Sequence, residues 1–217
     1  MKVLNLYAGI GGNRKLWGDG HEITAVEINP EIAKIYKDFF PKDKVIVGDA
    51  HKYLEEHYKE YDFIWASPPC PTHSRINFLN NEKVEKGIIP KFPDMKLYEE
   101  IIFLKTWFKG KWVVENVISY YEPLIKPFIC ASHYFWSNFY IDNKQAVNRG
   151  IRENIKYVEN KTGFNLNNYN NIEKRKVLNN CVEPKTGLHI FNMAFKTKQT
   201  TLLEPKSMNT KSRKAGR

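Results

Sequence analysis

The sequence predicts an α/β protein with a mostly parallel sheet and helices on both of its faces. Short apolar segments alternate with segments whose apolar residues recur at helical spacing, and this alternation is typical of parallel sheets. The apolar segments contain few polar residues, as expected of strands that are buried on both faces. Ligands bind at the carboxyl ends of the strands in such sheets, so the residues that follow each strand are the first candidates for function.

The elements of this sheet can be assigned in order along the chain. The first strand runs into the glycine turn AGIGG, and Pro30 opens the helix that follows the second strand. Gly110 ends an amphipathic helix before the fifth strand. We expect strands over residues 2–7, 21–29, 44–49, 62–67 and 111–117. We expect helices over residues 13–19, 30–41, 50–61 and 94–110, a long loop over residues 77–93 and a core strand in the aromatic run 132–141.

The composition and apolar periodicity of the sequence change after residue 142, and the chain divides into four expected parts. Residues 1–142 form the catalytic and cofactor-binding domain. Residues 143–177 are rich in Asn and Lys and poor in periodic apolar residues, so we expect a small inserted segment that is mobile or on the surface. It either contacts phosphates of a target or is a solvated loop. Residues 178–203 contain a helix that packs back on the sheet, and residues 204–217 form a basic mobile tail.

Composition narrows the class of protein. Hydrophobic residues make up 42% and aromatic residues 14% of the 217 residues, which favours a globular chain with one sizeable core. No apolar run approaches the ~20 residues of a membrane span, and the N-terminus lacks the pattern of a signal peptide. The 3 cysteines show no CxxC spacing, which argues against a disulfide framework or a zinc site. We therefore expect a cytoplasmic protein with reduced thiols and no metal.

The charge balance is basic. The 34 Lys and Arg residues exceed the 24 Asp and Glu residues, for a formal net charge of +10. Such an excess suits a polyanionic partner such as nucleic acid, although it could also simply keep the protein soluble.

The glycine turn after the first strand lets the backbone approach a ligand closely. Gly9 and Gly11 fit the start of a dinucleotide fingerprint, but Asn13 and Arg14 stand near the place of its third glycine. Glu27, after the second strand, is placed to accept hydrogen bonds from a ribose. Asp49 follows the third strand and could receive an adenine amine. Adenosine without a pyrophosphate favours S-adenosylmethionine over a nicotinamide cofactor. The alternative is a tight turn with two helix-capping carboxylates.

Cys70 stands between prolines just after the fourth strand, in SPPCP, where neither a helix nor a ladder can form. A nucleophilic cysteine needs an exposed, electropositive site, and Arg75 and the loop backbone are the candidates to provide it. Glu115 follows three apolar residues on the neighbouring strand, where a carboxyl group can be held partly protonated. Each residue alone is ordinary, but together they make a nucleophile and an acid that face one pocket.

Several stretches resemble the DNA cytosine-5 methyltransferase family in their order and spacing. They are NLYAGIGG, VEINP, GDAHKYL, ASPPCPTHSR, DMKLYEE and VVENV, which together span residues 4–117. The resemblance implies a Rossmann-like fold of the S-adenosylmethionine-dependent methyltransferases. It also implies a cytosine flipped out of double-stranded DNA as substrate. The chain would be a compact member with a reduced target-recognition region.

The resemblance also assigns roles to individual residues. Cys70 would be the nucleophile that adds to carbon 6 of cytosine, Glu115 would hold ring nitrogen 3, and Asn116 would complete the catalytic motif. The cofactor would contact Tyr7, Ala8, Gly9, Gly11, Gly12, Glu27, Asp49, Pro69 and Asn180. The substrate would contact Ser74, Arg75, His133 and Arg149.

The chain departs from the family in two places. The family usually has a Gln-x-Arg-x-Arg motif after ENV, but residues 132–141 read SHYFWSNFYI, so His133 or Arg149 would have to take its place. The region available for target recognition is also short. Two alternatives therefore stay open: the same chemistry on RNA such as tRNA, and a subunit that needs a partner chain for target recognition. A nicotinamide-dependent oxidoreductase fails on the absent third glycine and leaves Cys70 and Glu115 without a role.

Overall fold

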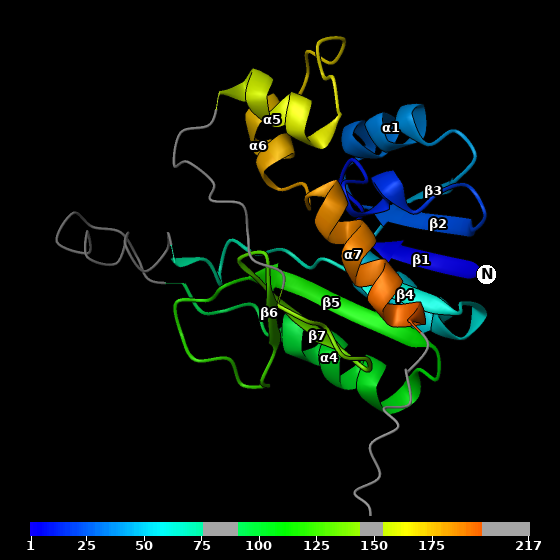
Figure 1. The fold of residues 1–217 in the computed structure, drawn as a ribbon, viewed down its shortest axis with the longest axis vertical. Coiled ribbons are helices and arrows are strands. Elements are labelled where there is room, and N and C mark those ends of the chain that lie inside the picture. Colours follow the sequence, from blue (N-terminus) through cyan, green and yellow to red (C-terminus); the bar gives the residue numbers. More distant parts are fainter. Residues whose placement is uncertain (76–90, 144–153, 197–217) are drawn as a thin grey trace, which may run out of the picture.

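The computed structural model describes residues 1–75, 91–143 and 154–196, and within them one seven-stranded sheet with the order β3-β2-β1-β4-β5-β7-β6 (Figure 1). β1 to β5 pair in parallel, whereas β7 runs antiparallel to both β5 and β6. The predicted mostly parallel sheet is therefore confirmed. The strands are β1 (Lys2–Leu6), β2 (Glu22–Glu27), β3 (Lys44–Val47), β4 (Phe63–Ala66), β5 (Lys111–Val117), β6 (Phe128–Cys130) and β7 (His133–Ser137).

The helices follow the predicted order with shorter bounds. Asn29 caps the helix that Pro30 opens, and Asp49 caps the next one. The helix expected over residues 13–19 is only one 3₁₀ turn, because Gly18 has a positive φ of 78° and stops it. The helical elements are η1 (Asn13–Leu16), α1 (Pro30–Phe39), α2 (Ala50–His57), η2 (Tyr58–Glu60), α4 (Lys96–Trp107), α5 (Ile155–Thr162), α6 (Lys174–Asn179) and α7 (Pro184–Phe195).

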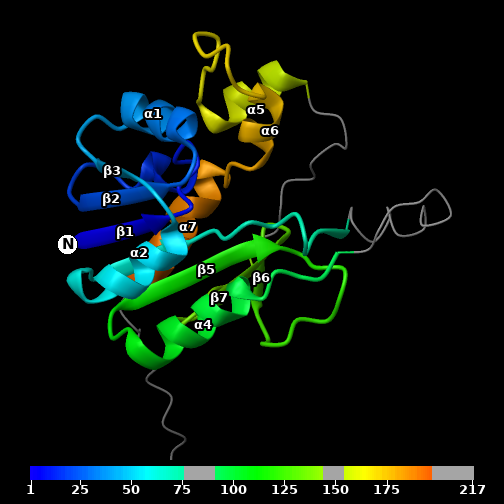
Figure 2. The ribbon, with the colours of Figure 1, turned by 180° about the vertical axis from the view of Figure 1, so that it is seen from behind.

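Alternate residues of each strand supply the two faces of the sheet. Leu4 and Leu6 of β1 point to the face covered by α2 and α4, where they pack with Leu54 and Leu104. Val3 of the same strand points to the opposite face, which α7 crosses. Figures 1 and 2 view these two faces from opposite sides. Helices thus cover both faces of the sheet, as predicted.

The strand order reverses between β1 and β4, which are neighbours although β2 and β3 lie between them in sequence. The chain leaves β1 to build one side of the sheet and returns to β4 to build the other. Connections that diverge in this way leave a crevice at the carboxyl ends of the two strands. The glycine turn and the Cys70 loop both start at this crevice, since they follow β1 and β4 respectively.

The described part of the segment 143–177 differs from the expected mobile or surface loop. It contains α5 and α6, and Phe164 and Leu166 between them are fully buried against Ile10 and Ile35. Lys15 reinforces this contact, because its Nζ donates to the Gly163 carbonyl at 2.8 Å and lies 4.0 Å from the centre of the Phe164 ring. Few apolar residues therefore suffice to anchor the segment, because the ones present are large and converge on a single site beside α1.

α7 lies against the turn that follows β1. A Cβ at Gly187 would clash with the backbone of Asn13, so only glycine permits this approach. The Trp17 indole also donates to the Gly187 carbonyl at 3.2 Å. The expectation of a C-terminal helix that packs on the sheet agrees with α7, while residues 197–217, including the predicted basic tail, lie outside the described residues. None of the described helices is long and apolar enough to cross a membrane.

Candidate active site

The glycine turn after β1 is tight and held by backbone hydrogen bonds. The amide of Gly11 donates to the carbonyl of Ala8 at 2.9 Å, and Tyr7, Gly9 and Gly11 all have positive φ angles. A Cβ at Gly12 would clash with the Cys181 sulfur, and one at Gly11 would clash with the Phe40 ring. A Cβ at Gly9 would meet no atom within 4 Å. Space for a ligand therefore remains beside Gly9, while Gly11 and Gly12 are needed for packing.

Glu27 and Asp49 hold the backbone at the ends of β2 and β3. Glu27 accepts hydrogen bonds from the amides of Gly9 and Asn29, both at 3.0 Å. Asp49 Oδ1 accepts from the first amides of α2, those of His51 at 2.9 Å and Lys52 at 3.3 Å. The alternative of helix-capping carboxylates holds for Asp49, the N-cap of α2, but not for Glu27, because Asn29 caps α1. These backbone contacts do not exclude ligand binding, because both residues also line a pocket.

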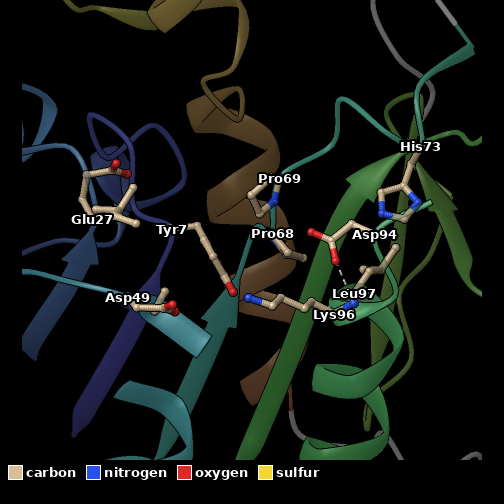
Figure 3. Close-up of a pocket in the computed structure, with 11 residues that line it drawn as sticks. Tyr7, Glu27, Asp49, Pro68, Pro69, His73, Asp94, Lys96 and Leu97 are labelled. Atoms are coloured by element: carbon tan, nitrogen blue, oxygen red, sulfur yellow. Dashed lines mark hydrogen bonds between the residues drawn. The ribbon is translucent and has the colours of Figure 1, made fainter. Parts of the chain in front are cut away.

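This pocket opens to solvent at the carboxyl edge of the sheet (Figure 3). Glu27 and Asp49 stand on one side of it in the close-up, and Pro69 and Leu97 on the other. Two carboxylates beside apolar side chains suit adenosine, whose ribose and amine donate hydrogen bonds while the flat base needs apolar contacts. Ile28, which is 69% exposed, is an apolar side chain available to the base. The residues present therefore fit the predicted cofactor.

The loop after β4 holds Cys70 by its backbone. The amides of His73 and Ser74 both donate to the Cys70 carbonyl, at 3.0 and 3.1 Å. The side chain of the buried Asn116 donates to the Pro68 carbonyl at 3.0 Å and so ties this loop to β5. The structure therefore gives Asn116 a positioning contact with the loop that carries the cysteine.

The environment of the Cys70 thiol differs from the expected one. Burial raises its pKa, and the negative charge of Glu115 raises it further. A backbone hydrogen bond lowers the pKa, as expected of the loop, whereas Arg75, also expected to make this site electropositive, is exposed. The described chain thus brings Cys70 and Glu115 close enough to interact, but it does not by itself favour the thiolate.

His133 lies beside Glu115, as required if it takes the place of the missing arginine motif. Its Nε2 is 3.7 Å from Glu115 Oε1, and its Nδ1 lies 3.1 Å from the Ala131 carbonyl. This position follows from strand pairing, because β7 begins at His133 and runs back along β5. The aromatic run is thus also the expected core strand, with Phe135 fully buried. Arg149 lies outside the described residues.

Two further predicted residues, Ser74 and Asn180, are described by their backbone positions. Ser74 forms an isolated bridge with Ser119, just beyond β5, and so braces the Cys70 loop. Asn180 is exposed at the end of α6, and its neighbour Cys181 lies close to the glycine turn at Gly12. Asn180 itself is not among the described residues that line the pocket, so its contact with the cofactor stays a prediction.

Sequence reasoning missed several residues around the pocket. His73 is buried and lies 2.6 Å from the Tyr121 hydroxyl through Nδ1, and burial lowers its pKa. Glu100 is fully buried and accepts a hydrogen bond from the Tyr7 hydroxyl. Glu100 ends the stretch DMKLYEE, to whose residues the resemblance assigns no individual role. A glutamate inside an apolar helix face was the available signal for Glu100.

Comparison with known proteins agrees with this site. The model of the family "C-5 cytosine-specific DNA methylase" matches residues 1–119, more than half of the chain. The chain belongs to this family. The resemblance stated from the motifs is thereby confirmed, and with it S-adenosylmethionine as the cofactor of the family.

Each alignment with a relative spans only part of this chain and only part of the relative. A tRNA (cytosine(38)-C(5))-methyltransferase of Spodoptera frugiperda is 34% identical over 80 residues, which span 34% of this chain and only 24% of that protein. The fold is similar to that of the Entamoeba histolytica methyltransferase EhMeth, with a TM-score of 0.44 and 15% identity over 72% of this chain and 62% of that one. A Spodoptera frugiperda DNMT2 mutant is similar with a TM-score of 0.36 and 26% identity, over 54% and 35% of the two chains.

Proposed function

We propose that this protein is a DNA cytosine-5 methyltransferase. It would transfer a methyl group from S-adenosylmethionine to carbon 5 of a cytosine flipped out of duplex DNA. The observation that carries the proposal is the arrangement of Cys70 and Glu115 at the carboxyl edge of the sheet, where Cys70 lies in the loop after β4 and Glu115 lies on the neighbouring strand β5. A pocket that includes Pro69, next to Cys70, lies at the same edge.

The residues of this chain account for the protein's part in the chemistry. The Cys70 thiolate adds to carbon 6 of the ring, while Glu115 in its protonated form donates to ring nitrogen 3, so that carbon 5 becomes nucleophilic. When bound, S-adenosylmethionine supplies the electrophilic methyl group and a positive charge near the thiol. After methylation, water as a base takes the proton from carbon 5, the bond between carbon 6 and sulfur breaks to release Cys70 as the thiolate, and the nitrogen 3 proton returns to Glu115. Asn116 holds the Pro68 carbonyl and thereby the loop that carries the nucleophile.

DNA is preferred as the substrate because the family that contains this chain is described by its DNA activity. The ring chemistry is the same for both nucleic acids, and the base must leave the stack in either case. A second candidate, cytosine-5 methylation of tRNA, is favoured by the similarity to the Spodoptera frugiperda tRNA enzyme. A third is a subunit that acquires its target through a partner chain, which the short segment between β7 and α7 favours.

Covalent trapping tests the proposal and separates these candidates. The protein is incubated with S-adenosylmethionine and with duplex DNA that carries 5-fluorocytosine, whose fluorine cannot leave as a proton does. We expect an adduct with the wild type, none with Cys70→Ala, and an unchanged adduct with the matched control Cys181→Ala. An adduct with 5-fluorocytosine RNA alone would replace DNA by RNA as the substrate. Measurable cofactor binding without any adduct would support the partner-dependent subunit and contradict the proposal.

A further inference from the structure

Glu100 lies at the junction of three elements that form the cofactor pocket. It belongs to α4, its side chain is fully buried, and its Oε1 accepts a hydrogen bond from the hydroxyl of Tyr7 at the end of β1. The same oxygen lies 3.0 Å from Nδ1 of His51, in the first turn of α2. The second oxygen, Oε2, has no hydrogen-bond partner in the part of the chain that the structure describes. One buried carboxylate thus joins β1, α2 and α4.

Each of these three elements also contributes a wall of the pocket. Tyr7 lines it directly, Ala50 precedes His51 in α2, and Leu97 lies one turn before Glu100 in α4. In Figure 3, Tyr7 extends between Asp49 and Lys96. Tyr7 also has a positive φ of 54°, a conformation that non-glycine residues adopt only when their surroundings impose it. The hydrogen bond from the Tyr7 hydroxyl to Glu100 fixes the far end of this side chain and is one of the contacts that can hold Tyr7 in this backbone conformation.

The charges around Glu100 favour a protonated His51. Its Nε2 lies 3.6 Å from Glu99 Oε2, so that two carboxylates flank the imidazole, while Lys96 on the same helix opposes them. The hydrogen bond with Glu100 raises the pKa of His51 above its ordinary value. Burial, followed by the charge of Glu100, raises the pKa of Tyr7, with smaller effects from Asp49 and Asp94, so Tyr7 stays a neutral donor.

We propose that Glu100 is a positioning residue for the cofactor and that protonated His51 keeps the pocket in its binding geometry. This inference rests on the proposed function, because it assumes that the pocket binds S-adenosylmethionine. A fully buried carboxylate needs a compensating charge, and His51 is the cation that touches it. When His51 loses its proton, the pair loses its positive partner, and only hydrogen bonds then join Glu100 to its neighbours. The contact between α2 and α4 then weakens, and with it the pocket between them.

The direction of the pH dependence follows from the raised pKa of His51. The pair is fully formed below the ordinary histidine pKa of about 6.5, and its contribution is lost as the pH rises through the higher pKa of the folded state. Cofactor affinity should therefore fall with rising pH in the wild type. Replacement of His51 by an uncharged residue should remove this dependence and leave the weaker affinity at every pH.

Titration calorimetry with S-adenosylmethionine between pH 5.5 and 9 tests the inference on the full chain. We expect wild-type affinity to fall roughly three- to tenfold across this range, and His51→Gln to show no such fall. The matched control is His57→Gln, because His57 lies on the same helix and pairs with Glu60 at 2.7 Å, away from the pocket. It should behave as the wild type does. Glu100→Gln should bind weakly at low pH and lose the pH dependence.

A second readout does not require the cofactor. The melting temperature of the wild type should exceed that of His51→Gln at pH 6, and the difference should shrink by pH 9. Equal pH dependence of cofactor affinity in the wild type and His51→Gln would overturn the inference while leaving the proposed function intact. The absence of any cofactor binding by the wild type would overturn both.

Discussion

The buried pair of Arg14 and Asp43 provides a prediction whose size can be worked out from the structure. Arg14 Nε donates to Asp43 Oδ2 at 2.9 Å and Nη2 donates to Oδ1 at 3.2 Å, with the two side chains 4% and 3% exposed. The hydroxyl of Tyr36 donates to the same carboxylate at 2.9 Å. This pair ties η1, the turn that follows the glycines after β1, to the residue just before β3.

Asp43→Asn removes one partner and leaves the other charge buried. Breaking a buried ion pair in this way costs about 3–5 kcal/mol, a large share of the about 5–15 kcal/mol that stabilises an ordinary domain. Tyr36→Phe removes one hydrogen bond to a charged acceptor and should cost about 1.5–3 kcal/mol. The double variant should lose less stability than the sum of the two single losses, because both substitutions act on the same carboxylate.

Equilibrium urea denaturation, followed by circular dichroism, measures these free energies of unfolding. Asp19→Asn is the control, because Asp19 approaches Arg14 at 3.7 Å but is 68% exposed, and it should change stability little. A loss below about 1 kcal/mol in Asp43→Asn would refute the reasoning, since it would mean that the Arg14 charge is compensated by other groups or by water.

Three further predictions concern the active site and its support. Asn116→Ala removes the hydrogen bond to the Pro68 carbonyl, so kcat should fall roughly tenfold or more while cofactor affinity stays unchanged. A fall in cofactor affinity with an unchanged kcat would contradict the positioning role of Asn116. Phe164→Ala should lower the free energy of unfolding by about 3–5 kcal/mol in urea, because the ring is fully buried; a loss under 1 kcal/mol would show that the segment is not part of the core. The rate of alkylation of Cys70 by iodoacetamide should rise with pH through a midpoint above the ordinary thiol pKa. Glu115→Gln should lower that midpoint because it removes a negative charge. An unchanged midpoint would show that the charge of Glu115 does not act on the Cys70 thiol.

Much of the cofactor half could be predicted because its signals are local. A strand, a turn and a helix start are each encoded within a few neighbouring residues, as in the run from β1 through the glycines. The same holds for Pro30 at the start of α1 and for Cys70 between its prolines. Once the strands were predicted to be parallel, their carboxyl ends had to meet at one edge. The grouping of Cys70 with Glu115 followed from that geometry alone.

The helices α5 and α6 show where local signals were insufficient. Their sequence is polar. The buried apolar residues are Phe164 and Leu166 between the two helices and Leu178 in α6, too few for a convincing amphipathic pattern. What orders this segment is a site on a distant part of the chain, formed by Ile10 and Ile35. The fit between the two packed surfaces stabilises that contact, and neither segment reveals it through a periodic apolar pattern.

The sequence by itself determined the order of the elements, the edge at which the site lies and the nature of its reactive groups, because these depend on residue type and on spacing over a few residues. The tertiary structure decided which polar groups pair across that edge. Tyr7 and Glu100 are 93 positions apart and meet only because β1 and α4 pack against each other. Likewise, Glu27 and Asp49 support the backbone as well as line the pocket. Such partners depend on distances through space, and spacing along the chain does not encode them.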